Sequence, residues 1–425
     1  MGVVRMREPT RIIRAALSGR DGQWDLELGD GRVRSVQPHD PLRPAADGGL
    51  DAVGVIDAAG GLVSRAFAEA HVHPDKSYSL SDLPDGIDQA ENGALDPFRR
   101  AARLKAGFTV DNVAARAERA LRLAVSNGTT AARITADVDT IAELRGFEGL
   151  VQARERVRDL MDVQIVAFPQ EGLLRDPGAE GLVREALRLG ADAVGGWPNV
   201  EADPAAERDH VRRVFDLAEE FDVDVDIHAD CFLDPEERML ECIAEETIRR
   251  GYRGRVLVSH CAALELQNDA DAERIIARVA EAGITIAVIP LNLADGGPRG
   301  LARPQELRAA GATVVSGSDN MNDGWYPLGT LNPLDRASMT FWGGSYDDES
   351  DIDTVWSMVS GEAWRALGRR GGDISAGMPA ELLVFAARDR AAALRDPLGG
   401  LTVLHRGRVV SRRRVMREFA EEAAR

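Results

Sequence analysis

Helix-like amphipathic segments and short apolar runs alternate along most of the chain from about residue 62. One amphipathic segment ends at Gly251 before RVLVSH, a second at Gly283 before ITIAVIP and a third at Gly311 before TVVSGSD. Each glycine can supply the left-handed conformation that ends a helix. The pattern predicts eight strands separated by helices, at residues 62–73, 129–138, 162–169, 193–198, 223–228, 255–260, 285–290 and 313–319.

The apolar runs are nearly continuous rather than alternating, which is typical of parallel strands buried on both faces. Eight such units predict a closed (β/α)₈ TIM barrel over residues 62–378. The flanks, residues 1–61 and 379–425, contain short strands and turn signals, and they predict one small β-sandwich domain built from both ends of the chain. The polar segment 77–108 is long for a loop and is a candidate lid.

Charge and composition narrow the class of protein. The chain has 52 basic and 70 acidic residues, a net charge of −18, which disfavours binding to nucleic acid or to an anionic membrane. Its three cysteines, Cys231, Cys242 and Cys261, lack CxxC spacing and predict no disulfide framework. No apolar run of about 18 residues occurs. We expect a cytoplasmic protein with a small-molecule substrate, and the sequence is compatible with a homo-oligomer.

Four of the seven histidines fall at carboxyl ends of predicted strands: His71, His73, His228 and His260. Barrel enzymes build their sites at that rim. The i, i+2 spacing of His71 and His73 points both imidazoles to the same face, and Asp319 ends the last strand, which lies beside the first once the barrel closes. A single histidine of this kind is usually an ordinary core residue, but the set indicates a metal centre. The remaining histidines are assigned structural or surface roles: His39, His210 and His405.

The stretches that carry these residues resemble a known superfamily. They are AHVHPDKS (70–77), VQIVAFPQEG (163–172), VDVDIHAD (223–230), VLVSHCAAL (256–264) and GSDNMNDGWYPLGT (317–330). In this order they resemble the amidohydrolase superfamily and, within it, the group of cytosine deaminases and N-isopropylammelide isopropylaminohydrolases. The resemblance covers nearly the whole chain, including the split β domain.

The resemblance implies that one divalent metal is held by His71, His73, His228 and Asp319. Such a metal lowers the pKa of a bound water to about 7. Asp319 would also act in catalysis by accepting the proton of that water, and His260 would stabilise or steer the attack. Zinc is the first candidate, with iron or manganese as alternatives. A single metal is expected because relatives with two metals carry a lysine at the end of the fourth strand, where this chain reads AVGGWPNV.

By the same resemblance, Gln170, Asn320 and Trp325 would contact the substrate ring. Gln170 could instead be an ordinary loop residue, and Trp325 could simply pack under its own loop. Asp75 and Lys76, which follow the two histidines, are interpreted as groups that fix the loop.

Three positions depart from cytosine deaminases. Cys231 occupies the place of a proton-shuttling glutamate, Asn320 replaces an aspartate, and Thr135 replaces a histidine. The sequence therefore predicts metal-dependent C–N cleavage, by deamination or dealkylamination, of a small nitrogen heterocycle other than cytosine. Two alternatives stay open: hydrolysis of a cyclic or linear amide, and a catalytically inactive homologue of the same barrel.

Overall fold

The computed structural model describes residues 8–41, 54–83, 97–231, 234–290 and 301–418. The chain divides into two compact units. The larger comprises Phe67–Ala124 and Thr129–Gly372, and the smaller comprises Met1–Ala66, Val125–Gly128 and Asp373–Arg425. Across the described ranges, no helix combines the length and the apolar character needed to cross a lipid bilayer.

The larger unit is a parallel eight-stranded barrel. Its strands follow one another around the sheet in chain order, and an isolated parallel bridge between Val72 and Asp319 joins the last strand to the first. Most of their residues are buried, as predicted for strands covered on both faces. The strands are β6 (Phe67–Val72), β7 (Thr129–Asp137), β8 (Asp162–Phe168), β9 (Ala193–Gly196), β10 (Asp224–Ala229), β11 (Val256–His260), β12 (Thr285–Val288) and β13 (Thr313–Ser316). The predicted TIM barrel is confirmed.

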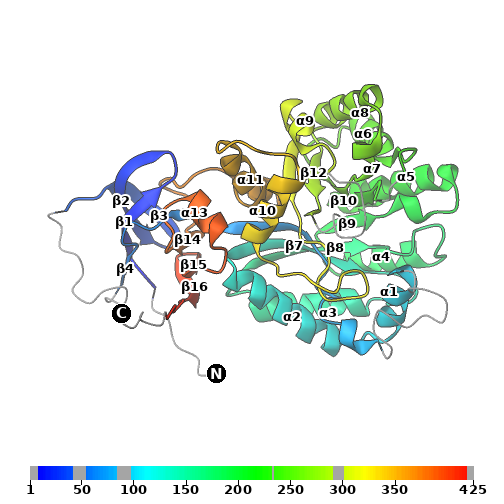
Figure 1. Ribbon diagram of the computed structural model, residues 1–425. Helices are drawn as coiled ribbons and strands as arrows, with labels where there is room; N and C mark the ends of the chain where they lie inside the picture. Colours follow the sequence, from blue (N-terminus) through cyan, green and yellow to red (C-terminus); the bar gives the residue numbers. More distant parts are fainter. Residues whose placement is uncertain (1–7, 42–53, 84–96, 232–233, 291–300, 419–425) are drawn as a thin grey trace, which may run out of the picture. The chain divides into compact units, whose positions relative to one another are not determined.

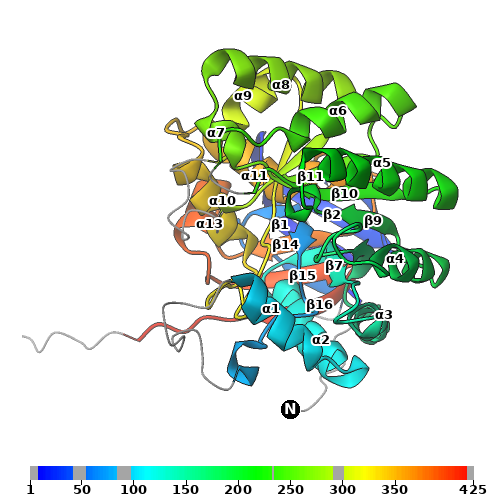
Figure 2. The same cartoon turned by 90° about the vertical axis from the view of Figure 1, so that its right-hand side faces the viewer.

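Helices lie outside these strands (Figures 1 and 2). Gly251 and Gly283 end two of them in the left-handed conformation, with φ of 69° and 63°, as their positions in the sequence predict. The helices of this unit are α1 (Pro97–Ala106), α2 (Val110–Ser126), α3 (Arg145–Val157), α4 (Ala179–Arg188), α5 (Pro204–Phe221), α6 (Met239–Arg250), α7 (Ala263–Leu266), α8 (Asp269–Ala282), α9 (Pro304–Ala309), α10 (Pro333–Gly343), α11 (Asp351–Val359) and α12 (Gly361–Ala366).

The smaller unit contains two four-stranded sheets that share one apolar core, which includes Ile12, Leu26, Val63, Leu382 and Leu404. Both ends of the chain contribute, as predicted. One sheet has the order β3-β2-β1-β4 and the other β16-β15-β14-β5. The elements are β1 (Arg11–Leu17), β2 (Arg20–Gly29), β3 (Arg32–Pro38), β4 (Val55–Asp57), β5 (Val63–Arg65), β14 (Leu382–Phe385), α13 (Arg390–Arg395), β15 (Leu401–His405) and β16 (Arg408–Arg413).

The prediction that residues 62–73 form a single barrel strand is wrong. It is two strands in two sheets: β5 pairs with β14 in the smaller unit, and β6 pairs with β7 in the barrel. The apolar run continues through the change of sheet because both strands are buried, so hydrophobicity alone gives no signal there. The candidate lid 77–108 contains α1 and a 3₁₀ turn, Leu80–Asp82, while its residues 84–96 lie outside the described part of the chain.

A buried carboxylate organises the loop that follows β8. The Glu201 side chain accepts hydrogen bonds from the backbone N–H groups of Leu173, Leu174 and Arg175, and its Oε1 lies 2.7 Å from His210 Nδ1. Burial acts to raise the pKa of Glu201, but these hydrogen bonds outweigh it and lower the pKa. Burial also lowers the pKa of His210. His210 therefore has a structural role, as the sequence predicts, in fixing the loop just beyond Gln170.

Replacing this carboxylate should destabilise the barrel. Glu201→Ala leaves buried N–H groups without an acceptor, and we expect the free energy of unfolding in urea to fall by about 3 kcal/mol at pH 7. Because the folded-state pKa of Glu201 is lowered, the stabilisation is present above the ordinary glutamate pKa of 4.5 and is lost as the pH falls through the folded value. The exposed Glu220→Ala on α5 is the control and should cost under about 1 kcal/mol. Equal losses of stability in Glu201→Ala and Glu220→Ala would contradict the structural role assigned to Glu201.

Candidate active site

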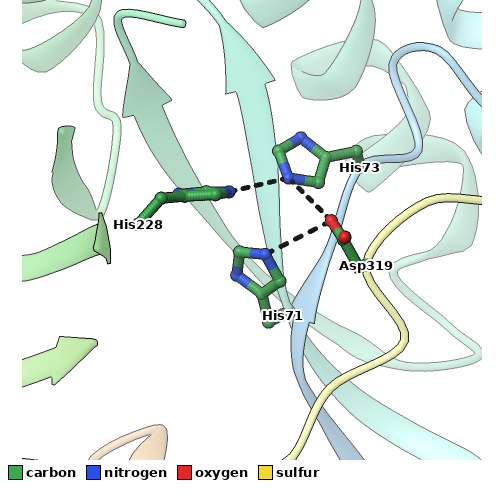
Figure 3. Close-up of side chains that lie close together, drawn as sticks. All are labelled: His71, His73, His228 and Asp319. Carbon is green, nitrogen blue, oxygen red and sulfur yellow. Dashed lines mark hydrogen bonds and ion pairs between the residues drawn. The ribbon is translucent and has the colours of Figure 1, made fainter. Parts of the chain in front are cut away.

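Four side chains from three parts of the barrel converge at the carboxyl ends of the strands. His71 lies on β6 and His73 directly after it, His228 lies near the end of β10, and Asp319 follows β13. All four are buried, between 1% and 4% exposed. Figure 3 shows the imidazoles and the carboxylate facing a common point. The structure therefore brings together the metal ligands that the sequence proposes.

The distances within this cluster suit one cation. His73 Nε2 lies 3.1 Å from His228 Nε2 and 3.4 Å from Asp319 Oδ1, and His71 Nε2 lies 3.5 Å from Asp319 Oδ1 (Figure 3). Nitrogen and oxygen ligands placed tetrahedrally about 2.1 Å from a metal are separated from each other by about 3.4 Å. One ligand atom from each of the four residues lies within 4.8 Å of the others. The donor set fits a divalent metal.

Carboxylates stand behind two of the imidazoles. Asp226 Oδ1 lies 4.0 Å from His71 Nδ1, and Asp137 Oδ1 lies 3.9 Å from His73 Nδ1. Asp226 is itself 3.7 Å from Arg133. A carboxylate on the far nitrogen of a ligating histidine favours the tautomer whose near nitrogen is free to bind a metal. At 4.0 Å and 3.9 Å these contacts are ion pairs and not hydrogen bonds, so the two carboxylates act on the imidazoles through their charge.

Burial and neighbouring charges shift the pKa values of the cluster in both directions. Burial, together with the charge of Lys76, lowers the pKa of His73 well below its ordinary value of 6.5, and burial likewise lowers the pKa of His228. Burial also acts to lower the pKa of His71, but nearby carboxylates, Asp319 first among them, outweigh it and raise the pKa. Burial acts to raise the pKa of Asp319, but the neighbouring histidines outweigh it and lower the pKa. Neutral imidazoles and an ionised carboxylate are the forms that bind a metal.

The two oxygens of Asp319 face different partners. Oδ1 faces His71 and His73 and accepts a hydrogen bond from Asn320 Nδ2 at 2.9 Å, whereas Oδ2 lies 3.9 Å from His260 Nε2. His260 and Asp319 both have positive φ, 72° and 59°. Among residues other than glycine, aspartate and histidine are two of the types that tolerate this conformation best. One carboxylate can thus serve as a ligand through one oxygen and meet His260 through the other.

The predicted substrate residues lie around this cluster. Gln170, 2% exposed, follows β8, and its Oε1 accepts a hydrogen bond from Lys76 Nζ at 2.7 Å. Asn320 directs its Nδ2 to Asp319, while its Oδ1 has no hydrogen-bond partner among the described residues. Asn320 also lines a small pocket of about 40 Å³ together with Ser318 and Arg336.

An aromatic wall stands next to His228. We use this name for Phe98, Phe168, Trp197 and Trp325. The Phe168 ring stacks on His228 at 4.2 Å between centroids, Phe98 lies 5.2 Å from Trp197, and Trp325 lies 5.1 Å from Phe98. Trp325 thus belongs to a cluster that borders the proposed metal site, beyond its own loop. Apolar aromatic faces of this kind favour a planar ring as ligand.

Two positions that depart from cytosine deaminases are also placed. Cys231 packs against the aromatic wall, and burial raises the pKa of its thiol well above the ordinary value of 9.0, so it is a neutral group at pH 7. Thr135 lies on β7 and is 1% exposed.

Sequence reasoning did not single out Asp137, Asp226, Trp197 or Phe98. Asp137 and Trp197 fall at the ends of predicted strands, so a search for every polar or aromatic residue at the barrel rim could have found them. Phe98 lies on α1, and no local pattern indicates that this helix brings its ring to Trp197.

A barrel with three imidazoles and one carboxylate at the carboxyl ends of its strands defines the class of metal-dependent barrel hydrolases. Residues 54–411 match the sequence profile of the amidohydrolase family. That match covers most of the chain, which therefore belongs to the amidohydrolase family and is a hydrolase of carbon–nitrogen bonds.

Individual relatives agree over nearly the full length. The chain is 28% identical over 413 residues to the N-isopropylammelide isopropyl amidohydrolase of Pseudomonas sp. strain ADP, covering 94% of this chain and 96% of that one. It is 30% identical over 404 residues to the pterin deaminase of Rhizobium rhizogenes, with coverage of 91% and 88%. Its structure matches 5-methylcytosine deaminase from Klebsiella pneumoniae liganded with 5-fluorocytosine, with a TM-score of 0.88, 29% identity and coverage of 96% and 99%.

The cluster should bind one equivalent of zinc. We expect chelator-stripped protein to take up a single zinc ion by calorimetry, and His228→Ala to lower the affinity at least about 100-fold because it removes one ligand. His39→Ala, in the smaller unit, is the matched control and should bind as the wild type does. The pKa of His71 is raised whereas those of His73 and His228 are lowered well below 6.5, so His71 should be the first imidazole to compete with the metal for protons as the pH falls. Zinc binding by His228→Ala with wild-type affinity would show that the cluster is not the metal site.

Proposed function

We propose that this chain uses one divalent metal to cleave an exocyclic C–N bond of a small nitrogen heterocycle, releasing ammonia or an alkylamine. The observation that carries the proposal is the cluster of His71, His73, His228 and Asp319 beside an aromatic wall. The names of the relatives support the substrate class, since an ammelide, a pterin and a methylcytosine are all planar nitrogen rings.

The residues of the chain have separate tasks in such a reaction. A divalent metal in the cluster would lower the pKa of a water to about 7 and so supply a nucleophile at neutral pH. Asp319, through the oxygen that faces His260, would accept a proton from the nucleophile and deliver it to the leaving nitrogen. His260 would stabilise negative charge as it develops on the heteroatom bonded to the attacked carbon, and the aromatic wall holds the ring and excludes water.

A single metal is favoured by the end of β9. That end carries Trp197 and a 3₁₀ turn, Pro198–Val200, and it has no lysine to bridge a second metal. Zinc is the first candidate because three of the four ligands are nitrogens, and iron or manganese would suit the same set.

Cytosine is disfavoured as the substrate. Cys231 packs in the aromatic wall as a neutral thiol and cannot replace a carboxylate that shuttles a proton to a ring nitrogen. Gln170, Asn320 and Trp325 are assigned to contact the ring, since they border the cluster or the wall. Hydrolysis of a cyclic or linear amide uses the same water and stays the second candidate.

Turnover should depend on Asp319. Asp319→Ala removes a metal ligand and the proton acceptor together, and we expect activity to fall at least about 10³-fold with the circular dichroism spectrum unchanged. The exposed Asp347→Ala is a control that should retain wild-type rates. Normal turnover by Asp319→Ala would end the proposed mechanism.

Cys231 should be dispensable. Since its thiol serves as an uncharged filler, Cys231→Ala should retain kcat/KM within about threefold of the wild type. A loss of more than about tenfold in steady-state assays would instead assign the thiol a part in the reaction.

The substrate class is tested by a screen of the zinc-loaded protein. The panel contains aminopyrimidines, oxo-triazines, their N-alkyl variants and hydantoin-like imides, and the readouts are ammonia, amine and carboxylic acid. Release of ammonia or amine from a ring supports the proposal, and release of acid favours the amide hydrolase. A protein that binds no metal and turns over none of these compounds would be an inactive homologue.

A further inference from the structure

The ammonium group of Lys76 is held between two buried side chains of the barrel. Its nitrogen lies 2.7 Å and 2.8 Å from the two oxygens of Asp137 and 2.7 Å from Gln170 Oε1. The two oxygens of one carboxylate share an N–H group, and a second N–H group donates to Gln170. Lys76, Asp137 and Gln170 are all buried, between 0% and 2% exposed. The contact between Lys76 and Gln170 is therefore shielded from solvent.

This contact fixes which end of the Gln170 amide faces inward. Lysine can only donate, so an amide NH₂ turned toward Lys76 would place donor against donor, and the carbonyl oxygen must take that side. The amide nitrogen is then directed away from Lys76. Gln170 Nε2 is buried and has no hydrogen-bond partner among the described residues. A buried N–H without an acceptor is costly, so this group is suited to a ligand that supplies one.

Gln170 also lies beside the proposed metal site. It is two residues beyond Phe168, whose ring stacks on His228, and the Asp137 carboxylate that grips Lys76 stands 3.9 Å from His73 Nδ1. Lys76 thus binds both the carboxylate behind the proposed metal ligand His73 and the predicted substrate-binding residue Gln170. A change in Lys76 would therefore reach the ring through Gln170.

We infer that Lys76 is a positioning residue that holds the Gln170 amide with its N–H groups toward the ligand. The site then prefers a ring with an exocyclic oxygen next to Gln170 to a ring with an amino group at that position. The inference rests on the proposed function, because it names a feature of the ring that this site would bind. The exocyclic oxygen accepts a hydrogen bond from Gln170 Nε2, whereas an amino group would place its own N–H donors against those of Gln170.

A second buried lysine provides a matched comparison. Lys105 is 0% exposed and bonds to Asp139 at 2.5 Å and Glu171 at 2.6 Å. It lies 3.9 Å from Asp137, and no hydrogen bond is found between it and Gln170 within the described ranges. Lys105→Met therefore removes a buried cation from the same neighbourhood while leaving the Gln170 amide held.

The test is calorimetric binding of two symmetric rings to the zinc-loaded protein. Cyanuric acid carries an exocyclic oxygen at each of its three equivalent positions and melamine an amino group, so the result does not depend on which edge meets Gln170. The wild type should bind cyanuric acid at least about tenfold more tightly than melamine. Gln170→Glu offers an acceptor in place of the donor and should reverse the order.

Lys76→Met frees the amide to turn, so the ratio of the two dissociation constants should fall toward one, while Lys76→Arg should restore the preference. Lys105→Met should keep the wild-type ratio. The two dissociation constants are compared within each variant, so a substitution that weakens the binding of both rings equally leaves their ratio unchanged. If Lys76→Met fails to fold, Lys76→Gln takes its place, because an amide can donate or accept and so no longer dictates which end of the Gln170 amide faces it, and the ratio should again fall toward one.

An unchanged ratio in Gln170→Glu, equal effects of Lys76→Met and Lys105→Met, or binding of neither ring by the wild type would each overturn the inference. The outcome is separate from that of the proposed function. The expected binding ratios without C–N cleavage of any compound would refute the function and leave the role of Lys76 standing, whereas cleavage with unchanged ratios would do the opposite.

Discussion

The backbone hydrogen bonds that close the barrel are the constraint on which the site depends. The N–H groups of Ser318 and Asp319 donate to the carbonyl of His71 at 3.0 Å and 2.9 Å, and the N–H of His73 donates to the carbonyl of Asp319 at 3.0 Å. These bonds place the carboxylate beside the two imidazoles, although the residues stand at opposite ends of the barrel sequence. A shift of one residue in this pairing would turn the side chains to the other face and separate the ligands.

Most of the barrel and its charged centre could be predicted from the sequence because both follow from local regularities. Apolar runs mark strands, glycines mark the ends of helices, and the spacing of His71 and His73 fixes a common face. The change of sheet at Ala66 escaped prediction because burial is continuous across it. Phe98 and Lys105 escaped because their partners are distant in sequence, and a helix pattern does not indicate which groups it will meet.

Buried ion pairs join the loops at the carboxyl ends of the barrel strands, and the hydrophobic pattern of the sequence does not indicate them. Lys76, which follows β6, and Lys105 on α1 lie among three carboxylates. Asp137 ends β7, Asp139 follows it, and Glu171 follows β8. Charges removed from water are tolerated only when they are paired with good geometry, so such a network fixes the loops that carry it. The proposed substrate contacts are thus held by ionic groups, whereas the strands below are held by apolar packing.

The aromatic wall has an optical consequence. Trp197 and Trp325 lie 5.9 Å apart between ring centroids, and they are two of the six tryptophans in the chain. Indole chromophores this close couple electronically, and their signal in near-ultraviolet circular dichroism depends on their mutual angle. A planar compound that settles against them would alter both that signal and their emission, so the protein carries a built-in spectroscopic reporter of occupancy that needs no label.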